Sequence, residues 1–240
     1  MTQSDERFPV EPWCVRELGF RRDDLAVTES LFTLSNGHIG IRGNLDEGDP
    51  NGLPGTYLNS FYEKRPLPYA EAGYGYPESG QSVVNVTDGK LIRLLVDDEP
   101  FDLRYGDVRH HERVLDLRRG VLERTVEWCS PSGVEVRVRS TRLVSLRRRS
   151  LVAIAWSVEP LRDPVNIVVQ SELVADEEIP RHSSDPRVAA ALESPLEAIE
   201  HGAWRSRALL VHRTGRSRLN LAVAMENHVD GVEEIGRAHV

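Results

Sequence analysis

The chain has 240 residues, of which 40% are hydrophobic and 28% are charged, proportions typical of a folded globular protein rather than a disordered one. Its 38 Asp and Glu residues outnumber its 30 Lys and Arg residues, which gives a formal charge of −8. This excess of negative charge argues against a dedicated nucleic-acid binder and against docking on an anionic membrane, because both need an excess of positive charge.

Cysteine usage and the N-terminal sequence indicate a reducing compartment. The two cysteines, Cys14 and Cys129, are too few for a disulfide framework or a structural zinc site. The first 13 residues are polar and acidic, without the basic flank and apolar core of a secretory signal. The longest apolar run, residues 151–156, is far too short to span a bilayer. We therefore expect a cytoplasmic protein.

Near the N-terminus, glycine recurs every three residues, at Gly37, Gly40 and Gly43. This spacing matches neither the P-loop nor the dinucleotide-binding fingerprint, and no strand–helix–strand pattern surrounds it. The spacing predicts a tight turn that enters a strand, with glycine supplying a positive φ. The neighbouring polar side chains of Arg42, Asn44 and Glu47 are candidates for contact with a sugar or with a second domain.

Residues 48–82 contain five of the six tyrosines, Tyr57 among them, together with many prolines and glycines. We predict a long loop here, without regular helix or strand, and loops of this length are usually functional or disordered. A tyrosine ring offers a flat apolar face and a polar tip, which suit a carbohydrate or an interdomain surface. Alternatively, the tyrosine rings only pack the loop onto the hydrophobic core.

Strand patterns dominate the rest of the chain. Residues 83–86 and 91–96 flank Asp88-Gly89, a dipeptide typical of a type I′ hairpin, and Asp97-Asp98 predicts a further turn. Residues 121–129 and 134–139 flank the turn sequence Pro131-Ser132-Gly133 and predict a second hairpin. Other β-rich runs are residues 151–158, 165–169, 208–212 and 219–225.

One segment, residues 185–193, combines a capping Asp with a first-turn Pro and predicts a short helix. Strands at short spacing with turns between them otherwise predict an all-β protein, an antiparallel β-sandwich with long loops.

The residues show no complete catalytic constellation. His110 and His111 are adjacent, so on a strand their rings would point to opposite faces, and we expect a solvated strand end instead of a metal site. Paired carboxylates occur at Asp46-Glu47, for example, but adjacency in sequence does not give the spatial separation that glycosidase acid–base pairs need. We predict no catalytic residue and no metal ligand in this chain.

Six strings together resemble the N-terminal domain of glycoside hydrolase family 65. They are ESLFTLSNGHIGIRGNLDEG (29–48), GTYLNSFYE (55–63), VVNVTDG (83–89), VDDEPFDL (96–103), LDLRRGVLERTVEW (115–128) and SPSGVEVRVRSTRLVSL (130–146). The resemblance covers about residues 11–228 in family order, and the first string is the most specific. Ser60 departs from the pattern, which has Gly there, and this departure concerns local loop geometry.

The resemblance implies a large two-sheet β-sandwich of the galactose-mutarotase-like type. In full-length members a linker and a helical barrel follow, and the barrel holds the general acid and the phosphate site. Such enzymes are inverting phosphorylases, with some hydrolases, acting on α-linked glucose disaccharides. Inorganic phosphate is their co-substrate, β-glucose 1-phosphate their product, and no cofactor is expected.

Because the general acid and the phosphate site lie in the barrel, the resemblance implies that this chain alone is inactive. It also implies a homodimer for the full-length protein. Arg42, Asn44, Glu47 and Tyr57 are the candidates for residues near the substrate or the barrel.

The last six residues, IGRAHV (235–240), match the translation of a common sequencing adapter. We therefore expect residues 1–234 to form an incomplete β-sandwich domain that, expressed alone, self-associates through an unpaired edge. Two alternatives come from other classes of protein: a stand-alone carbohydrate-binding β-sandwich and a purely structural dimerisation module. Glycan binding by this chain alone would favour the first alternative.

Overall fold

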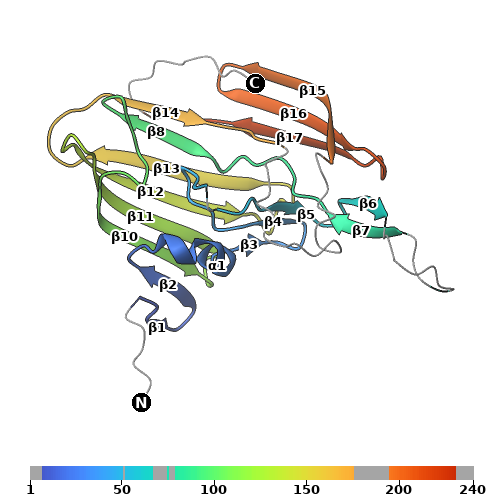
Figure 1. The fold of residues 1–240 in the computed structure, drawn as a ribbon, viewed down its shortest axis with the longest axis horizontal. Coiled ribbons are helices and arrows are strands. Elements are labelled where there is room, and N and C mark those ends of the chain that lie inside the picture. The colour runs from blue at the N-terminus through green and yellow to red at the C-terminus, as the bar shows by residue number, and fades with distance from the viewer. Residues whose placement is uncertain (1–6, 51, 67–74, 76–78, 176–194, 231–240) are drawn as a thin grey trace. The chain divides into compact units, whose positions relative to one another are not determined.

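The computed structural model describes residues 7–50, 52–66, 75, 79–175 and 195–230 (Figure 1). The chain forms two compact units, each built from two separate stretches of sequence. Unit 1 comprises residues 1–53 and 90–172, and unit 2 comprises residues 54–89 and 173–240. The expectation of an all-β protein is confirmed.

Unit 1 is a β-sandwich. One sheet has six strands in the order β1-β2-β10-β11-β12-β13, and the other has three in the order β14-β8-β9. The strands of the first sheet are β1 (Val10–Glu11), β2 (Cys14–Leu18), β10 (Asp107–Asp116), β11 (Val121–Cys129), β12 (Glu135–Val144) and β13 (Val152–Pro160). Those of the second are β8 (Ile92–Val96), β9 (Glu99–Pro100) and β14 (Ile167–Ser171). Unit 1 also contains a 3₁₀ turn (Arg22–Asp24), helix α1 (Leu25–Leu31) and the paired strands β3 (Leu34–Ser35) and β4 (Ile39–Ile41).

The core of unit 1 lies between its two sheets. Alternate residues of each strand point inward, because successive side chains on a strand face opposite sides. Trp128 is fully buried in this core, packs edge-on against Phe101 and donates its indole N–H to the Tyr105 carbonyl at 2.7 Å. The buried members of the core are Leu94, Val96, Phe101, Val126, Trp128, Val136 and Val138.

Unit 2 contains a three-stranded antiparallel sheet and a two-stranded hairpin. The sheet has the order β15 (Leu196–Trp204), β16 (Arg207–Thr214) and β17 (Asn220–Glu226), and the hairpin joins β6 (Tyr62–Pro66) to β7 (Ser79–Val83). Strand β5 (Thr56–Leu58) precedes them. The core of unit 2 draws Phe61, Val84 and Val86 from its first stretch of sequence and Leu196 and Leu221 from its second.

Several sequence predictions are confirmed. Strands β11 and β12 form the predicted hairpin, with Val126 opposite Val138. Asp97 and Asp98 form the predicted turn between β8 and β9, with φ of 46° and 67°. Gly37 has φ 81° and enters β4, as the glycine spacing predicts.

The predicted hairpin at Asp88-Gly89 is wrong. Strand β8 pairs with β14 and β9, while Asp88 forms an antiparallel bridge with Val174. Val84 and Val86 are buried in the core of unit 2, whereas β8 is buried in the core of unit 1. Packing into two cores therefore outweighs the local turn preference of Asp-Gly.

The prediction of a long loop without strands over residues 48–82 is also wrong in part, because β5, β6 and β7 lie there. Glu63 on β6 is buried and accepts the backbone N–H groups of Lys64, Arg216 and Ser217 at 2.7–2.9 Å. Burial alone would raise the pKa of Glu63, but these hydrogen bonds hold it below its usual value. A carboxylate thus ties β6 to the turn between β16 and β17.

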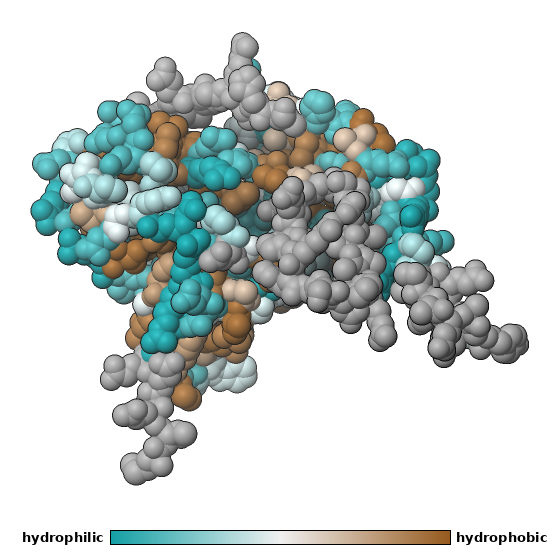
Figure 2. All heavy atoms as spheres, viewed as in Figure 1, coloured by the Kyte–Doolittle hydropathy of each residue, from teal (hydrophilic) through white to brown (hydrophobic). Residues whose placement is uncertain are grey.

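Helix α1 was not predicted, and the predicted helix at residues 185–193 lies outside the described residues. Asp24 precedes α1 without forming a side-chain cap, so the usual signal for a helix start is missing. In the space-filling view, brown hydrophobic surface appears between teal hydrophilic regions (Figure 2). Two side chains of α1, Val27 and Leu31, are among the exposed hydrophobic residues.

Candidate functional site

Three arginines lie on the inner face of the six-stranded sheet, where apolar side chains are usual. Arg113 on β10, Arg124 on β11 and Arg142 on β12 are 2%, 5% and 2% exposed. Arg113 and Arg124 are direct cross-strand partners, so two positive charges face each other. Removing a charge from water is costly unless the charge is paired, so each guanidinium needs a carboxylate.

The segment that follows β4 supplies carboxylates to Arg124 and Arg142. Arg124 donates two hydrogen bonds to Glu47, at 2.6 Å and 2.7 Å, and a third to Asp46 Oδ2 at 3.0 Å. Asp46 Oδ1 accepts from Arg142 Nη2 at 2.6 Å, and Oδ2 accepts from Ser140 at 2.8 Å. Burial alone would raise the pKa of Asp46, but Arg142 and Arg124 outweigh burial and lower it. Asp46 is therefore ionised, with both carboxylate oxygens bound.

A second ion pair joins β2 to β10. Glu17 lies opposite Arg113 in the strand register, and Arg113 Nε donates to Glu17 Oε2 at 2.7 Å. Arg7 Nε donates to the other carboxylate oxygen at 3.1 Å. Arg113 Nη1 reaches the carbonyl of Gly43 at 3.1 Å, and its Cζ lies 4.7 Å from the ring centroid of Phe32. Burial nevertheless lowers the pKa of Arg113, because Glu17 compensates only part of the lost hydration.

His111 lies against these arginines. Arg124 Nε donates to His111 Nε2 at 3.3 Å, and His111 Nδ1 lies 3.1 Å from the carbonyl of Gly19. These partners indicate a neutral imidazole with its proton on Nδ1. Burial, followed by the charges of Arg124 and Arg113, holds the pKa of His111 well below 6.5. The predicted solvated strand end is therefore wrong for His111, although His110 is exposed.

Two of the predicted site residues, Arg42 and Asn44, bind backbone and side-chain groups of their own unit. Arg42 donates to the Ser30 hydroxyl at 2.8 Å and to the Ala26 carbonyl at 2.7 Å, both on α1. Asn44 donates to the Leu53 carbonyl at 2.8 Å. Arg42 therefore anchors its segment to the helix, and Asn44 joins the same segment to Leu53.

Buried Glu29 lies between these two groups. Its Oε2 accepts the N–H of Leu53 at 3.2 Å and lies 3.7 Å from Arg42 Nη2. Burial raises the pKa of Glu29, and the hydrogen bond from Asn44 and the charge of Arg42 offset only part of that effect. The structure thus brings Arg42, Asn44 and Glu29 into one cluster.

The other two predicted residues belong to different units. Glu47 is buried against Arg124, as described above, and Tyr57 lies half-buried in β5 of unit 2. Whether Arg42, Asn44, Glu47 and Tyr57 act near a substrate or a second domain stays a prediction. Sequence analysis missed Glu17, Arg113, Arg124 and Arg142. A signal for two of them exists, since Arg113 shares the strand phase of buried Leu115, and Arg124 that of Val126.

These buried ion pairs stabilise the fold and are not arranged for acid–base catalysis. Acid–base catalysis needs a carboxylate within reach of a substrate proton, whereas Glu17, Asp46 and Glu47 are buried and bound to guanidinium groups. In the part of the chain that the structure describes, no group of three or more His, Cys, Asp or Glu side chains is placed to hold a metal ion. No helix among the described residues combines the length and apolar character needed to cross a membrane.

Sequence comparisons relate the chain to enzymes of carbohydrate metabolism. The pattern of the glycosyl hydrolase family 65 N-terminal domain matches residues 15–239. An uncharacterized glycosyl hydrolase of Mycobacterium tuberculosis is 61% identical over 227 residues, which are 95% of this chain and 29% of the relative. The α,α-trehalose phosphorylase of Thermoanaerobacter brockii is 38% identical over 225 residues, 92% of this chain and 29% of that enzyme.

The fold is shared with a solved structure described as a kojibiose phosphorylase from the human microbiome. The TM-score is 0.78 at 24% identity, over 96% of this chain and 29% of the other. The chain therefore spans 29% of the length of these relatives. Because the family pattern covers nearly the whole sequence, the chain belongs to glycosyl hydrolase family 65, as an N-terminal domain of that family.

Proposed function

We propose that this chain is the non-catalytic N-terminal part of an enzyme that cleaves α-linked glucose disaccharides, by phosphorolysis or by hydrolysis. The observation that carries the proposal is the family match over residues 15–239, combined with a span of 29% of the relatives' length. The relatives include a trehalose phosphorylase and a maltose phosphorylase. In this proposal the general acid and the phosphate site lie outside the chain.

The internal bonding of the described carboxylates supports a non-catalytic role. Glu47 is held by two hydrogen bonds from Arg124, and Asp46 is held by Arg142, Arg124 and Ser140. Carboxylates fixed in this way stabilise the loop after β4 rather than exchange protons with a sugar. Under the proposal, Arg42, Asn44 and Tyr57 fix the conformation of loops that lie near the substrate or the barrel.

The remaining parts of the proposal concern the whole enzyme. Inorganic phosphate is its co-substrate if it is a phosphorylase, and it needs no cofactor. It is a cytoplasmic homodimer that binds neither nucleic acid nor membrane. Size-exclusion chromatography with light scattering on the full-length protein tests the dimer, and a single-subunit mass contradicts it.

A comparison of the enzymatic activities of two proteins tests the function. The full-length protein and the 240-residue chain are each incubated with trehalose, maltose and kojibiose, with and without inorganic phosphate. We expect the full-length protein to cleave one of these sugars and the isolated chain to cleave none. Phosphate-dependent release of β-glucose 1-phosphate indicates an inverting phosphorylase, and phosphate-independent release of glucose indicates a hydrolase.

Two results would contradict the proposal. Cleavage by the 240-residue chain would place catalytic residues within it. A full-length protein that is folded but inactive on every α-glucoside tested would favour one of the two non-enzymatic alternatives.

A further inference from the structure

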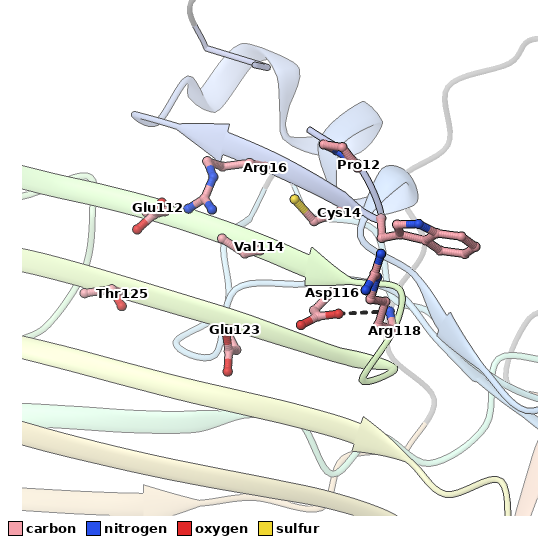
Figure 3. Close-up of a pocket in the computed structure, with 10 residues that line it drawn as sticks. Pro12, Cys14, Arg16, Glu112, Val114, Asp116, Arg118, Glu123 and Thr125 are labelled. Atoms are coloured by element: carbon pink, nitrogen blue, oxygen red, sulfur yellow. Dashed lines mark hydrogen bonds and ion pairs between the residues drawn. The ribbon is translucent and has the colours of Figure 1, made fainter. Parts of the chain in front are cut away.

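A hollow of about 390 Å³ opens on the outer face of the six-stranded sheet. Its residues come from the neighbouring strands β2, β10 and β11 and from the turns at their ends (Figure 3). The volume falls in the range of about 300–1,000 Å³ that is usual for pockets that hold small molecules. None of these residues belongs to the buried ionic network on the opposite face.

The strand register explains the hollow. Arg16, Val114 and Glu123 lie in one row across β2, β10 and β11, so the short Val114 side chain stands between two long ones. Cys14 and Thr125, on neighbouring rows, are also short. Short side chains therefore lie between longer polar ones in this hollow, and the close-up view shows Val114 on the strand between those that carry Arg16 and Glu123 (Figure 3).

An exposed tryptophan stands at the rim. Trp13 is 60% exposed and, with Pro12, makes the two-residue turn between β1 and β2. Its φ of 64° is a conformation that a bulky residue rarely adopts, since the second central position of such a Pro-led turn favours glycine. A strained residue that persists in a structure is a reason to look for a function.

The rim is held in place by contacts to the turn after β10. The backbone N–H of Leu117 donates to the Trp13 carbonyl at 2.8 Å. Asp116 accepts the backbone N–H groups of Arg118 and Arg119 at 2.9 Å and 3.0 Å. The Arg118 guanidinium lies over the indole, with Cζ 5.4 Å from the ring centroid. A preorganised rim reduces the entropy that binding would cost.

The charges of the lining favour a neutral, hydroxyl-rich ligand. Two guanidinium groups, on Arg16 and Arg118, face three carboxylates, on Glu112, Asp116 and Glu123, which disfavours phosphates and other anions. Glu112 is paired with Arg16, and Glu123 accepts a hydrogen bond from Arg119 at 2.7 Å. These two carboxylates already have a positively charged partner, which makes binding of a further cation less favourable. Each ionised carboxylate still has further lone pairs for hydroxyl donors.

We propose that this hollow binds the pyranose ring of a neutral sugar. The apolar face of the ring packs on the Trp13 indole, and its hydroxyls donate hydrogen bonds to Glu123 and Asp116. The proposal goes beyond the function proposed above, because it gives this chain a sugar-binding site of its own that needs no catalytic step. With such a site, sugar binding by the chain is expected of the enzyme as well as of a stand-alone binding module, and the activity of the full-length protein distinguishes the two.

Hydroxyl-radical footprinting of tryptophans on the full-length protein tests the site. The probes are maltose, trehalose and the anion glucose 1-phosphate. Trp204, which is 50% exposed and lies on β15, serves as the internal control within the same molecule. We expect saturating maltose or trehalose to slow oxidation of Trp13 several-fold relative to Trp204, and glucose 1-phosphate to protect Trp13 less.

Two matched variants locate the protection. Thr125→Tyr fills the hollow at a strand position that tolerates an aromatic residue, so protection of Trp13 by maltose should be lost. Ala155→Tyr adds the same side chain at an exposed position on β13, where β12 separates it from β11, and protection should remain.

Three results would overturn the site: unchanged Trp13 oxidation with both neutral sugars, protection that survives Thr125→Tyr, or stronger protection by glucose 1-phosphate than by maltose. The oxidation of Trp13 is measured without catalytic turnover. The sugar site can therefore be refuted while the enzymatic proposal holds, and the enzymatic proposal can fail while the sugar site holds.

Discussion

At the scale of single residues, Arg124 connects three buried partners of the ionic network. It binds Asp46, Glu47 and His111, all on the inner face of the sandwich. Removing one partner of a buried ion pair leaves the other charge unpaired in a poorly hydrated environment, which costs about 3–5 kcal/mol. The same interaction on an exposed surface contributes only about 0–1 kcal/mol.

We therefore expect Arg124→Met to lower the free energy of unfolding by about 3–5 kcal/mol, measured by urea denaturation. The control is Arg137→Met on the outer face of β12, where Arg137 pairs with the partly exposed Glu127 and Glu159. That control should lose about 1 kcal/mol or less. Equal losses in the two variants would show that burial of the network contributes nothing.

The lowered pKa of His111 makes the free energy of unfolding depend on pH. Its pKa in the folded protein lies below the ordinary 6.5, so below pH 6.5 the unfolded chain takes up a proton that the native state does not. The stability that neutral His111 contributes is therefore present at neutral pH and is lost as pH falls from 6.5 toward the folded-state pKa. The loss approaches about 1.4 kcal/mol per pH unit in that window.

Urea unfolding at about pH 7 and about pH 5.5 measures this loss. We expect His111→Gln to lose less stability than the wild type between the two pH values. His110→Gln, at the exposed neighbour, should keep the slope of the wild type. A His111→Gln slope that matches the wild type would show that another group titrates in this window.

At the scale of elements, Gly43 brings the segment that follows strand β4 close to helix α1. A Cβ built on Gly43 would lie 2.5 Å from Phe32 Cβ and 2.8 Å from the Phe32 carbonyl oxygen. The N–H of Gly43 also donates to the Glu29 carbonyl at 2.9 Å. Only glycine lets the two backbones approach in this way.

Gly43→Ala should lower the thermal midpoint and the free energy of unfolding, the latter by about 1–3 kcal/mol, because backbone must move to admit the methyl group. Gly40→Ala is the matched control in the same glycine series. Its added Cβ would meet nothing closer than Ser35 Oγ at 3.7 Å. If the two variants unfold at the same temperature, the close approach at Gly43 is not the constraint.

Elements also show what the sequence can and cannot predict. The β11–β12 hairpin is predictable because alternation and turn residues agree locally. The Asp88-Gly89 hairpin fails because its two flanks enter different cores, which no local pattern reveals. Ser60 is instructive, since its φ of 65° is a left-handed conformation that glycine adopts more readily than serine. The buried arginines are hard to predict, because charged side chains are rarely buried unless they are paired and no local pattern reveals their partners.

At the scale of the whole molecule, the division into two units predicts separate local stabilities. Leu94 belongs to the core of unit 1 and Leu221 to that of unit 2. Leu→Ala in a core costs about 2–5 kcal/mol. We expect Leu94→Ala to reduce hydrogen-exchange protection in β10–β12 and Leu221→Ala to reduce it in β15–β17. Equal loss of protection in both regions from either variant would show one cooperative unit.

The discontinuous make-up of unit 2 bears on synthesis at the ribosome. Phe61, Val84 and Val86 emerge first, but Leu196 and Leu221, with which they pack, follow only after residues 90–172. At about 5–20 residues per second, translating that insert takes on the order of ten seconds. During this time the early half of the core has no partner in the nascent chain. Molecular chaperones that shield apolar segments would therefore affect the yield of unit 2 more than that of unit 1.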